Sequence, residues 1–309
     1  MPRMNHDDRQ GVLRHGFDFS YKEGGGCTRK EIMTKTKKRD LIQESYPELY
    51  YPDSVYTAST KVFLRFVEHL NAEHVFIYLY TDLVEGFESV LKNLPLKHLI
   101  TCSSLAIKSC RFSFLKLLFP FVNRGCGLRI YPFKTRDDEE EAIDSAIFDS
   151  ELVKTAPFLM ICIECLISDE QLLCLKAYWI YIPFARSISE EGLIRLIMQW
   201  VEGKRRLNRI YLGNVLALTE DMIYKLRRFK LIPESELIKT PFFTDFMETH
   251  FRSGFRVGIR NKAGNLILVN VSEDSFEIED PYSDYDLPFS DCCIECIIED
   301  DDDDDDDDD

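Results

Sequence analysis

The chain has 309 residues, of which 45% are hydrophobic, enough to bury the core of one large domain or two small ones. Its formal net charge is −16, but the eleven acids of Glu299–Asp309 carry most of it and leave only −5 for the rest. A mildly acidic chain lacks the clustered Lys and Arg of a phosphate-binding surface, so no nucleic-acid partner is expected. The uninterrupted apolar runs are far shorter than a membrane span, so no membrane partner is expected.

The first residues, MPRMNHDDRQ, lack the apolar core of a signal peptide, and the ten cysteines are scattered through a large chain. We therefore expect reduced thiols in an intracellular protein, cytoplasmic or nuclear, rather than a disulfide scaffold. The arm of residues 1–54 is polar, contains three consecutive glycines and lacks helical periodicity until about Glu31. This composition predicts a largely disordered arm.

From Ser59 onward, amphipathic helical stretches alternate with apolar strands. The first pair is the helix KVFLRFVEHL followed by the strand HVFIYLY, and strong strand patterns recur at FLMICIECL and KAYWIYIPF. The acidic stretch of residues 137–155 is expected to form one long helix, since its five leading acids suit a helix N-terminus. The alternation predicts a mainly parallel sheet with helices on one face.

Residues 188–212 contain the most complete helix-and-strand unit. Ser189 is the expected N-cap of a helix that ends at Gly203, and a strand with the L-x-x-L-x-L spacing of leucine-rich repeats follows, with Asn214 near the usual asparagine place. One face of the helix carries an apolar stripe, formed by Leu193, Leu196, Ile197 and Trp200.

Two other segments, LISDEQLLCL and ALTEDMIYKL, share the start of this unit: an apolar residue, Ser or Thr, two acids and a helix. The expected caps are Ser168, Ser189 and Thr219, and only Ser168 completes a capping box, with Gln171. The caps are 21 and 30 residues apart, which is too unequal for a regular solenoid. We therefore predict an α/β fold built as a degenerate leucine-rich-repeat-like solenoid with mainly parallel strands.

The last part of the chain has a different pattern. FRVGIR, NLILVNV and SFEIED alternate apolar and polar residues around short turns, so residues 255–280 are predicted to form an antiparallel β-meander that closes one end of the solenoid. Residues 286–309 are predicted to be an acidic disordered tail, because a run of aspartates repels itself. The folded domain should therefore span residues 55–285.

The stretch QWVEGKRRLNRIYL resembles the core motif of the nematode F-box-associated family, type 2. FLRFVEHLNAEHVFIYL is similar to the opening helix and strand of that family, and FRVGIRNKAGNLILVNVSEDSFEIED to its closing strand segment. The resemblance is one of pattern and order, covers roughly residues 55–285 and includes no catalytic motif. Members usually carry an F-box at the N-terminus. The F-box docks a Skp1-type adaptor, while the F-box-associated domain presents the target.

The resemblance implies a protein-protein interaction module: the substrate-recognition domain of an F-box ubiquitin ligase adaptor, with a protein target as partner. Residues 1–54 depart from the family pattern, because they offer no Leu- and Pro-rich stretch of amphipathic helices. At most, Lys35–Gln43 matches a short piece of the last F-box helix. A Skp1-type adaptor is thus expected only if an F-box is present or remnant. The alternative is a free-standing binding domain, or a truncated family member without a ligase role.

Enzymatic chemistry is the less favoured alternative. The histidines have no metal-binding or catalytic spacing, and no cysteine stands in a recognisable nucleophile context. Two motifs could supply thiolates for zinc on paper, Cys162 with Cys165 and Cys292 with Cys293 and Cys296. Residues three apart in a strand point to opposite faces, which favours buried free thiols. We expect no catalytic residue, no metal and no cofactor.

Strand alternation predicts a partner-binding surface on the side of the sheet away from the helices. The set expected to face the helices is Tyr178, Ile180, Ile182, Ile210 and Leu212. The outward set is Trp179, Tyr181, Arg209 and Tyr211, joined at the far end by Phe76 and Tyr78. Aromatic and Arg side chains dominate interface energetics, so the outward set is our candidate binding surface. The alternative is that the N-terminal arm or the C-terminal meander covers this surface and turns it into a second core.

Overall fold

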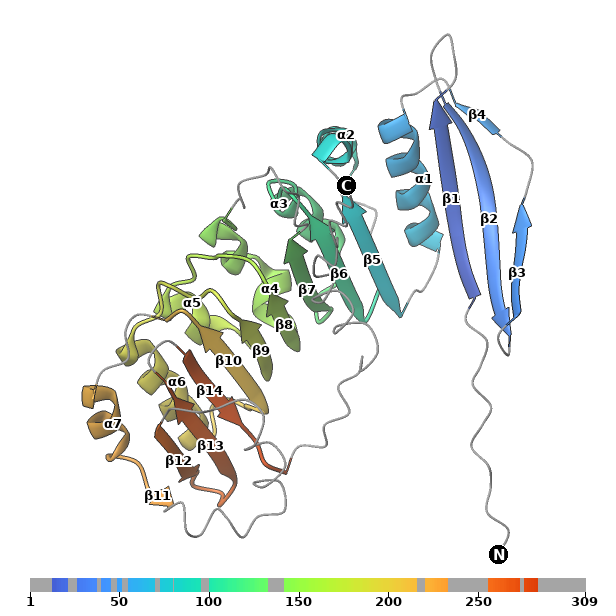
Figure 1. The fold of residues 1–309 in the computed structure, drawn as a ribbon. Helices are drawn as coiled ribbons and strands as arrows, with labels where there is room; N and C mark the ends of the chain where they lie inside the picture. Colours follow the sequence, from blue (N-terminus) through green and yellow to red (C-terminus); the bar gives the residue numbers. More distant parts are fainter. Residues whose placement is uncertain are drawn as a thin grey trace, which may run out of the picture.

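The computed structural model describes residues 13–21, 27–37, 40–45, 49–51, 55–69, 73–79, 81–95, 100–132, 142–215, 220–232, 255–272 and 275–282. A ten-stranded mixed sheet organises the fold (Figure 1). Six of its strands pair in parallel, in sequence order: β5 (His74–Leu79), β6 (Ser104–Ser109), β7 (Gly127–Pro132), β8 (Phe158–Ile161), β9 (Trp179–Ile182) and β10 (Arg209–Gly213). The expected mainly parallel sheet is confirmed.

The other four strands continue the same sheet in the antiparallel sense. They are β11 (Leu231–Ile232), β12 (Phe255–Arg260), β13 (Leu266–Val271) and β14 (Ser275–Glu279). The predicted meander is confirmed, and β14 joins it edge to edge to β10. The order is β11-β12-β13-β14-β10-β9-β8-β7-β6-β5, so the sheet does not close on itself.

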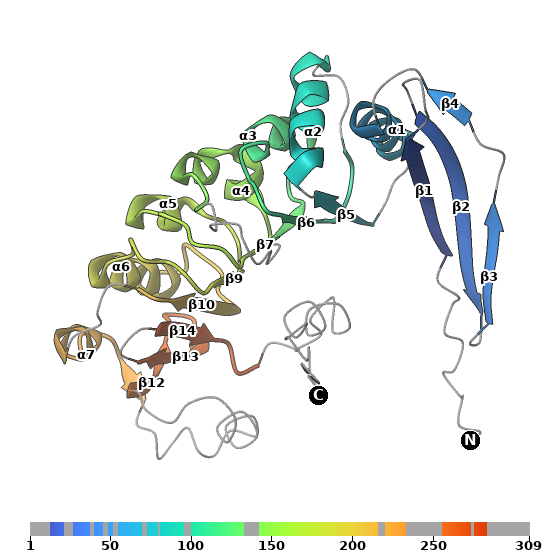
Figure 2. The same cartoon turned by 45° about the horizontal axis from the view of Figure 1, so that its top comes forward.

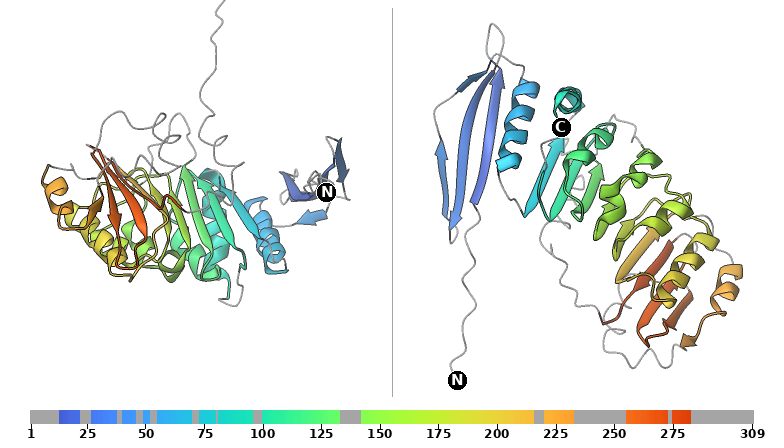
Figure 3. Two further views of the ribbon diagram at one scale, coloured as in Figure 1. Left: turned by 90° about the horizontal axis from the view of Figure 1, so that it is seen from below. Right: turned by 180° about the vertical axis from the view of Figure 1, so that it is seen from behind.

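The helices gather on one side of this sheet. They are α1 (Val55–His69), α2 (Thr81–Asn93), α3 (Leu115–Leu118), α4 (Glu151–Thr155), α5 (Asp169–Cys174), α6 (Glu190–Val201) and α7 (Glu220–Leu226). Figure 2 shows them along the outside of an arc, with the strands inside it, and Figure 3 (left) shows the two layers from below. We call the opposite side of the sheet, which carries no described helix, the open face.

The sheet contributes mainly aliphatic side chains to the core between the sheet and the helices. Strand register aligns one side chain from each of nine neighbouring strands into a continuous row, and every member is buried: Val75, Leu105, Leu128, Leu159, Ile180, Ile210, Ile278, Val269 and Val257. One large hydrophobic cluster extends from Leu64 to Ile278 through the described part of residues 55–282, and Ile232 and Leu266 form a small second cluster.

The N-terminal region is a second, smaller sheet. Its four antiparallel strands are β1 (Leu13–Tyr21), β2 (Cys27–Lys37), β3 (Asp40–Ser45) and β4 (Leu49–Tyr51), and β1 and β2 contact α1 (Figure 3, right). The disordered arm expected for residues 1–54 is therefore wrong for these strands. LRHGFDFSY alternates apolar and polar residues, a strand signal that a search for helical periodicity does not detect. The predicted acidic tail of residues 286–309 lies outside the described residues.

The long helix expected for residues 137–155 is wrong where the structure describes it. Two short helices stand there instead, the 3-10 helix η2 (Ser145–Asp149) and α4. Asp144 accepts a hydrogen bond from Ala146 N at 2.8 Å, and Ser150 accepts one from Val153 N at 3.3 Å. Because a capping residue has extended rather than helical backbone, Ser150 separates the two helices.

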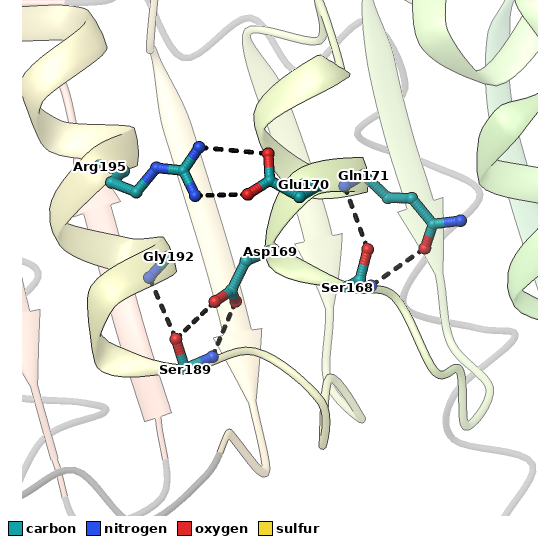
Figure 4. Close-up of polar contacts among 7 residues, drawn as sticks. All are labelled: Ser168, Asp169, Glu170, Gln171, Ser189, Gly192 and Arg195. Atoms are coloured by element: carbon teal, nitrogen blue, oxygen red, sulfur yellow. Dashed lines mark hydrogen bonds and ion pairs between the residues drawn. The ribbon is translucent and has the colours of Figure 1, made fainter.

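Helices α5 and α6 are joined by their caps (Figure 4). Ser168 and Gln171 form the predicted capping box on α5, and Ser189 caps α6 by accepting from Gly192 N at 3.2 Å. The Asp169 carboxylate then accepts hydrogen bonds from the backbone N–H and the hydroxyl of Ser189. A side chain on Gly192 would collide with Asp169. In a capping box, the N–H of the capping residue donates to a side chain in the first turn of the same helix. In α6 the acceptor is instead Asp169 of the preceding helix, α5.

The other features predicted for residues 188–214 are also found. The stripe that includes Trp200 is buried, and α6 ends at Val201, two residues before Gly203, whose φ of +74° is the left-handed conformation that glycine favours. Asn214 follows β10 with a φ of +49°, and its amide donates to the Pro183 carbonyl at 3.3 Å, which joins the loops after β9 and β10. The third predicted cap, Thr219, lies outside the described residues.

Replacing Trp200 with alanine should destabilise the protein by roughly 3 to 5 kcal/mol, because its side chain is only 5% exposed and its loss leaves a large cavity. Chemical denaturation of the full chain measures this change. The matched control is Tyr224→Ala on α7, where a side chain that is 69% exposed should be replaced without loss. Equal midpoints for the Trp200 variant and the native chain would contradict the core assignment.

Asp169→Ala should lower the free energy of unfolding by about 1 to 2 kcal/mol, because the N–H and hydroxyl of Ser189 lose their acceptor. Thermal unfolding checks this expectation. Glu170→Ala is the control, since Glu170 makes an exposed ion pair with Arg195 whose loss should leave the melting temperature almost unchanged. A larger effect for Glu170 than for Asp169 would disprove the linking role of the cap.

Candidate functional site

The structure brings the four predicted binding residues together on the open face. Trp179 pairs in register with Arg209, and Tyr181 with Tyr211, across the parallel ladder of β9 and β10. The rings of Tyr181 and Tyr211 stack with centroids 5.0 Å apart and planes 19° apart, and Trp179 stacks on Tyr181 at 6.2 Å. All four side chains are half-buried. They therefore form one contiguous surface that is neither closed core nor fully exposed.

Phe158 on β8 extends this surface, so we name Phe158, Trp179, Tyr181 and Tyr211 the aromatic row. The Phe158 ring meets Trp179 edge to face, with ring centroids 6.5 Å apart, and the Arg129 guanidinium lies 5.3 Å from the centroid of the Phe158 ring. The ring also lies against Gly127, where a Cβ would collide with it. Phe158 and Arg129 were not predicted from the sequence, because the register between β7 and β8 decides which side chains meet.

Phe76 and Tyr78 lie on the same face but do not join the row. They are 43% and 51% exposed on β5, and β6, β7 and β8 separate that strand from β9. Three intervening strands place them more than about 15 Å from Trp179. Of the set predicted to face the helices, Ile180, Ile182, Ile210 and Leu212 are buried as expected. Tyr178 is half-buried, with the Arg206 guanidinium 5.3 Å from its ring centroid.

The row ends in a polar group on β14, which pairs Glu279 with Arg209 and Glu277 with Tyr211. Arg209 Nη2 lies 3.5 Å from Glu277 Oε1. Both carboxylates are almost completely buried, with exposed fractions of 5% for Glu277 and 9% for Glu279. These two glutamates were not predicted from the sequence, because β14 lies far from β10 along the chain.

Burial shifts the acidity of both carboxyl groups. It raises the pKa of Glu277 above its ordinary value, although Arg209 opposes the change. Burial also raises the pKa of Glu279, to about 7, again against the attraction of Arg209. Two buried polar atoms here, Glu279 Oε1 and Trp179 Nε1, have no hydrogen-bond partner in the part of the chain that the structure describes. The polar end of the row therefore holds one buried acceptor and one buried donor that no described residue satisfies.

The alternative, that the C-terminal meander covers these residues, is wrong. Strands β12, β13 and β14 continue the sheet beside β10 and do not lie over it. The described N-terminal strands form their own sheet, and β1 and β2 contact α1. Neither described segment makes the aromatic row a second core.

The cysteines offer less chemistry. Cys162 is half-buried, whereas Cys165 is buried, and its burial raises the pKa of its thiol to about 12. The predicted second zinc motif, Cys292, Cys293 and Cys296, lies outside the described residues. Among the described side chains, no group of three or more His, Cys, Asp and Glu is placed to hold a metal ion.

Comparison of the chain with protein-family models finds no matching family, and comparison with curated proteins finds no similar protein. The resemblance to the F-box-associated family therefore stays a prediction. None of the helices within the described residues is long and apolar enough to cross a membrane.

Glu279→Gln should stabilise the protein at pH 8 and have a smaller effect at pH 5. A carboxyl whose folded-state pKa lies above its unfolded one favours folding when protonated, so this contribution is lost as the pH rises through about 7. Urea unfolding at both pH values measures the difference. Glu85→Gln, which alters a carboxylate whose side chain is 85% exposed, is the control. Greater stabilisation at pH 5 than at pH 8 would contradict the assignment.

Proposed function

We propose that this protein is a protein-protein interaction module that binds a protein partner on the open face, through Trp179, Tyr181, Arg209 and Tyr211. The observation that carries the proposal is the stack of three aromatic rings on two adjacent strands, with an arginine on the same face of the sheet. Large rings contribute much contact area, and Trp, Tyr and Arg dominate interface energetics.

The packing of these rings favours binding further. Each ring is held by its neighbour on the sheet, and Phe158 rests against the backbone of Gly127, so little side-chain freedom is left to lose on association. Rigid strands also hold a binding surface more precisely than loops do. A partner therefore meets a surface that is already organised.

More specifically, we favour the interpretation that this module is a leucine-rich-repeat-like solenoid. It would serve as the substrate-recognition domain of an F-box ubiquitin ligase adaptor. The strand-helix units around α5 and α6, their linked caps and the asparagine after β10 support the repeat interpretation. The described N-terminal residues form strands, where an F-box needs amphipathic helices. That observation favours the alternative, a free-standing binding module without a ligase role. Complex formation between the purified chain and a Skp1-type adaptor separates the two.

The paired variant Trp179→Ala with Tyr211→Ala should abolish partner capture while leaving the folded state intact, because the two rings flank the stack and face away from the aliphatic core. Co-precipitation from a cell extract with quantitative mass spectrometry gives the readout, and the melting temperature of each variant is measured alongside it.

The matched control is Leu166→Ala with Tyr224→Ala, which removes two exposed apolar side chains, 53% and 69% exposed, outside the aromatic row. It should retain every captured protein. Equal loss in both paired variants would refute the proposed surface. A large fall in the melting temperature of the Trp179 and Tyr211 variant alone would identify those residues as packed core.

A further inference from the structure

The polar end of the aromatic row contains two buried atoms whose hydrogen-bonding capacity is unused. Glu279 Oε1 is an acceptor and Trp179 Nε1 is a donor, and both lack a partner within the described residues. They lie on the same face, because Trp179 and Glu279 each pair in register with Arg209 from opposite sides. Leaving such groups unsatisfied costs free energy, so their retention on a candidate binding surface calls for a ligand that completes them.

The charges around Glu279 favour a cation. The described charged groups that act on it electrostatically are Arg209 on β10, Arg256 on β12, Glu277 on its own strand and the adjacent Asp280. Arg209 already pairs with Glu277, at 3.5 Å. Glu279 Oε1 has no donor among the described residues, and a positively charged donor is the strongest complement of a carboxylate oxygen.

The spacing selects a side chain long enough to connect the two unsatisfied atoms. One strand separates β9 from β14, so the backbones of Trp179 and Glu279 lie about 10 Å apart along the sheet. An arginine residue is long enough to bridge two strands, so that its peptide carbonyl would accept from the indole N–H while its guanidinium donates to the carboxylate. Guanidinium also stacks on aromatic rings, whereas the compact ammonium of lysine has no flat face to stack.

We infer that the polar end of the aromatic row is an arginine-binding subsite, in which Glu279 accepts from the guanidinium of a partner's arginine and Trp179 donates to that partner's backbone. This inference rests on the proposed function, since it names the chemistry by which the open face recognises its protein partner. Binding requires the ionised carboxylate, so affinity should fall as the pH drops below about 7.

The test uses the full chain and three small probes: the N-acetyl methylamides of arginine, lysine and citrulline. Citrulline is the neutral counterpart of arginine, with nearly the same shape. The chain has only two tryptophans, Trp179 and the core residue Trp200, so two indole N–H signals report binding by NMR, and Trp179→Phe assigns them. The arginine probe should shift the Trp179 signal alone, and citrulline should shift neither.

Glu279→Gln should weaken binding of the arginine probe at pH 8 by about tenfold or more, which is the usual contribution of a hydrogen bond to a charged group. The native chain should lose a similar factor between pH 8 and pH 5.5. Glu85→Gln, on the far surface of α2, should keep full affinity. Because Glu279→Gln is expected to be the more stable protein at pH 8, weaker binding cannot be ascribed to unfolding.

Equal binding of citrulline and arginine, or full affinity in Glu279→Gln, would overturn the inference. Failure of the arginine probe together with loss of partner capture in the Trp179 and Tyr211 variant overturns the subsite and leaves the proposed function standing. Retained capture by that variant together with arginine binding to the native chain overturns the proposed function and leaves the subsite standing.

Discussion

Side chains of a strand can point only to the two faces of its sheet, and the rest of this structure depends on how those faces are divided. The helices seal one face, so every strand from β5 to β10 must supply it with aliphatic residues, and the register joins these into one buried row. Rings and charges within β5 to β10 are thereby directed to the other face. The stack of Trp179, Tyr181 and Tyr211 is a consequence of the same alternation that places Ile180 and Ile210 in the core.

The hydrogen bonds between the caps of α5 and α6 fix the spacing of these two helices along the sheet. Asp169 at the start of α5 holds the first turn of α6 through Ser189, and Gly192 leaves room for it (Figure 4). Since α5 leads into β9 and α6 leads into β10, fixing α5 against α6 also limits how β9 and β10 can slide past each other. A slip of one residue would send Tyr211 into the core and Ile210 to the open face, so the stack relies on contacts made on the opposite side of the sheet.

The sequence was informative where signals are local. The cap at Ser189, the stop at Gly203 and the apolar stripe of α6 each lie within one turn of the features they determine, and all were predicted. The N-terminal strands were missed because polar alternation in a glycine-containing stretch resembles disorder in composition. Glu277 and Glu279 could not be assigned to the site, since their position follows from pairing between β10 and a strand much later in the chain. Non-local register is the information that residue patterns lack.

The place of β14 has a consequence for how the molecule is made. The last described strand in sequence is internal in the sheet, between β10 and β13. During synthesis, β10 therefore remains an unpaired edge until Ser275–Glu279 has left the ribosome, and an apolar edge of this kind can recruit strands from other chains. Premature termination anywhere before Ser275 would leave that edge permanently open. The unfinished chain thus carries an aggregation hazard that the finished one lacks, and the pairing that removes it is also the one that completes the polar end of the aromatic row.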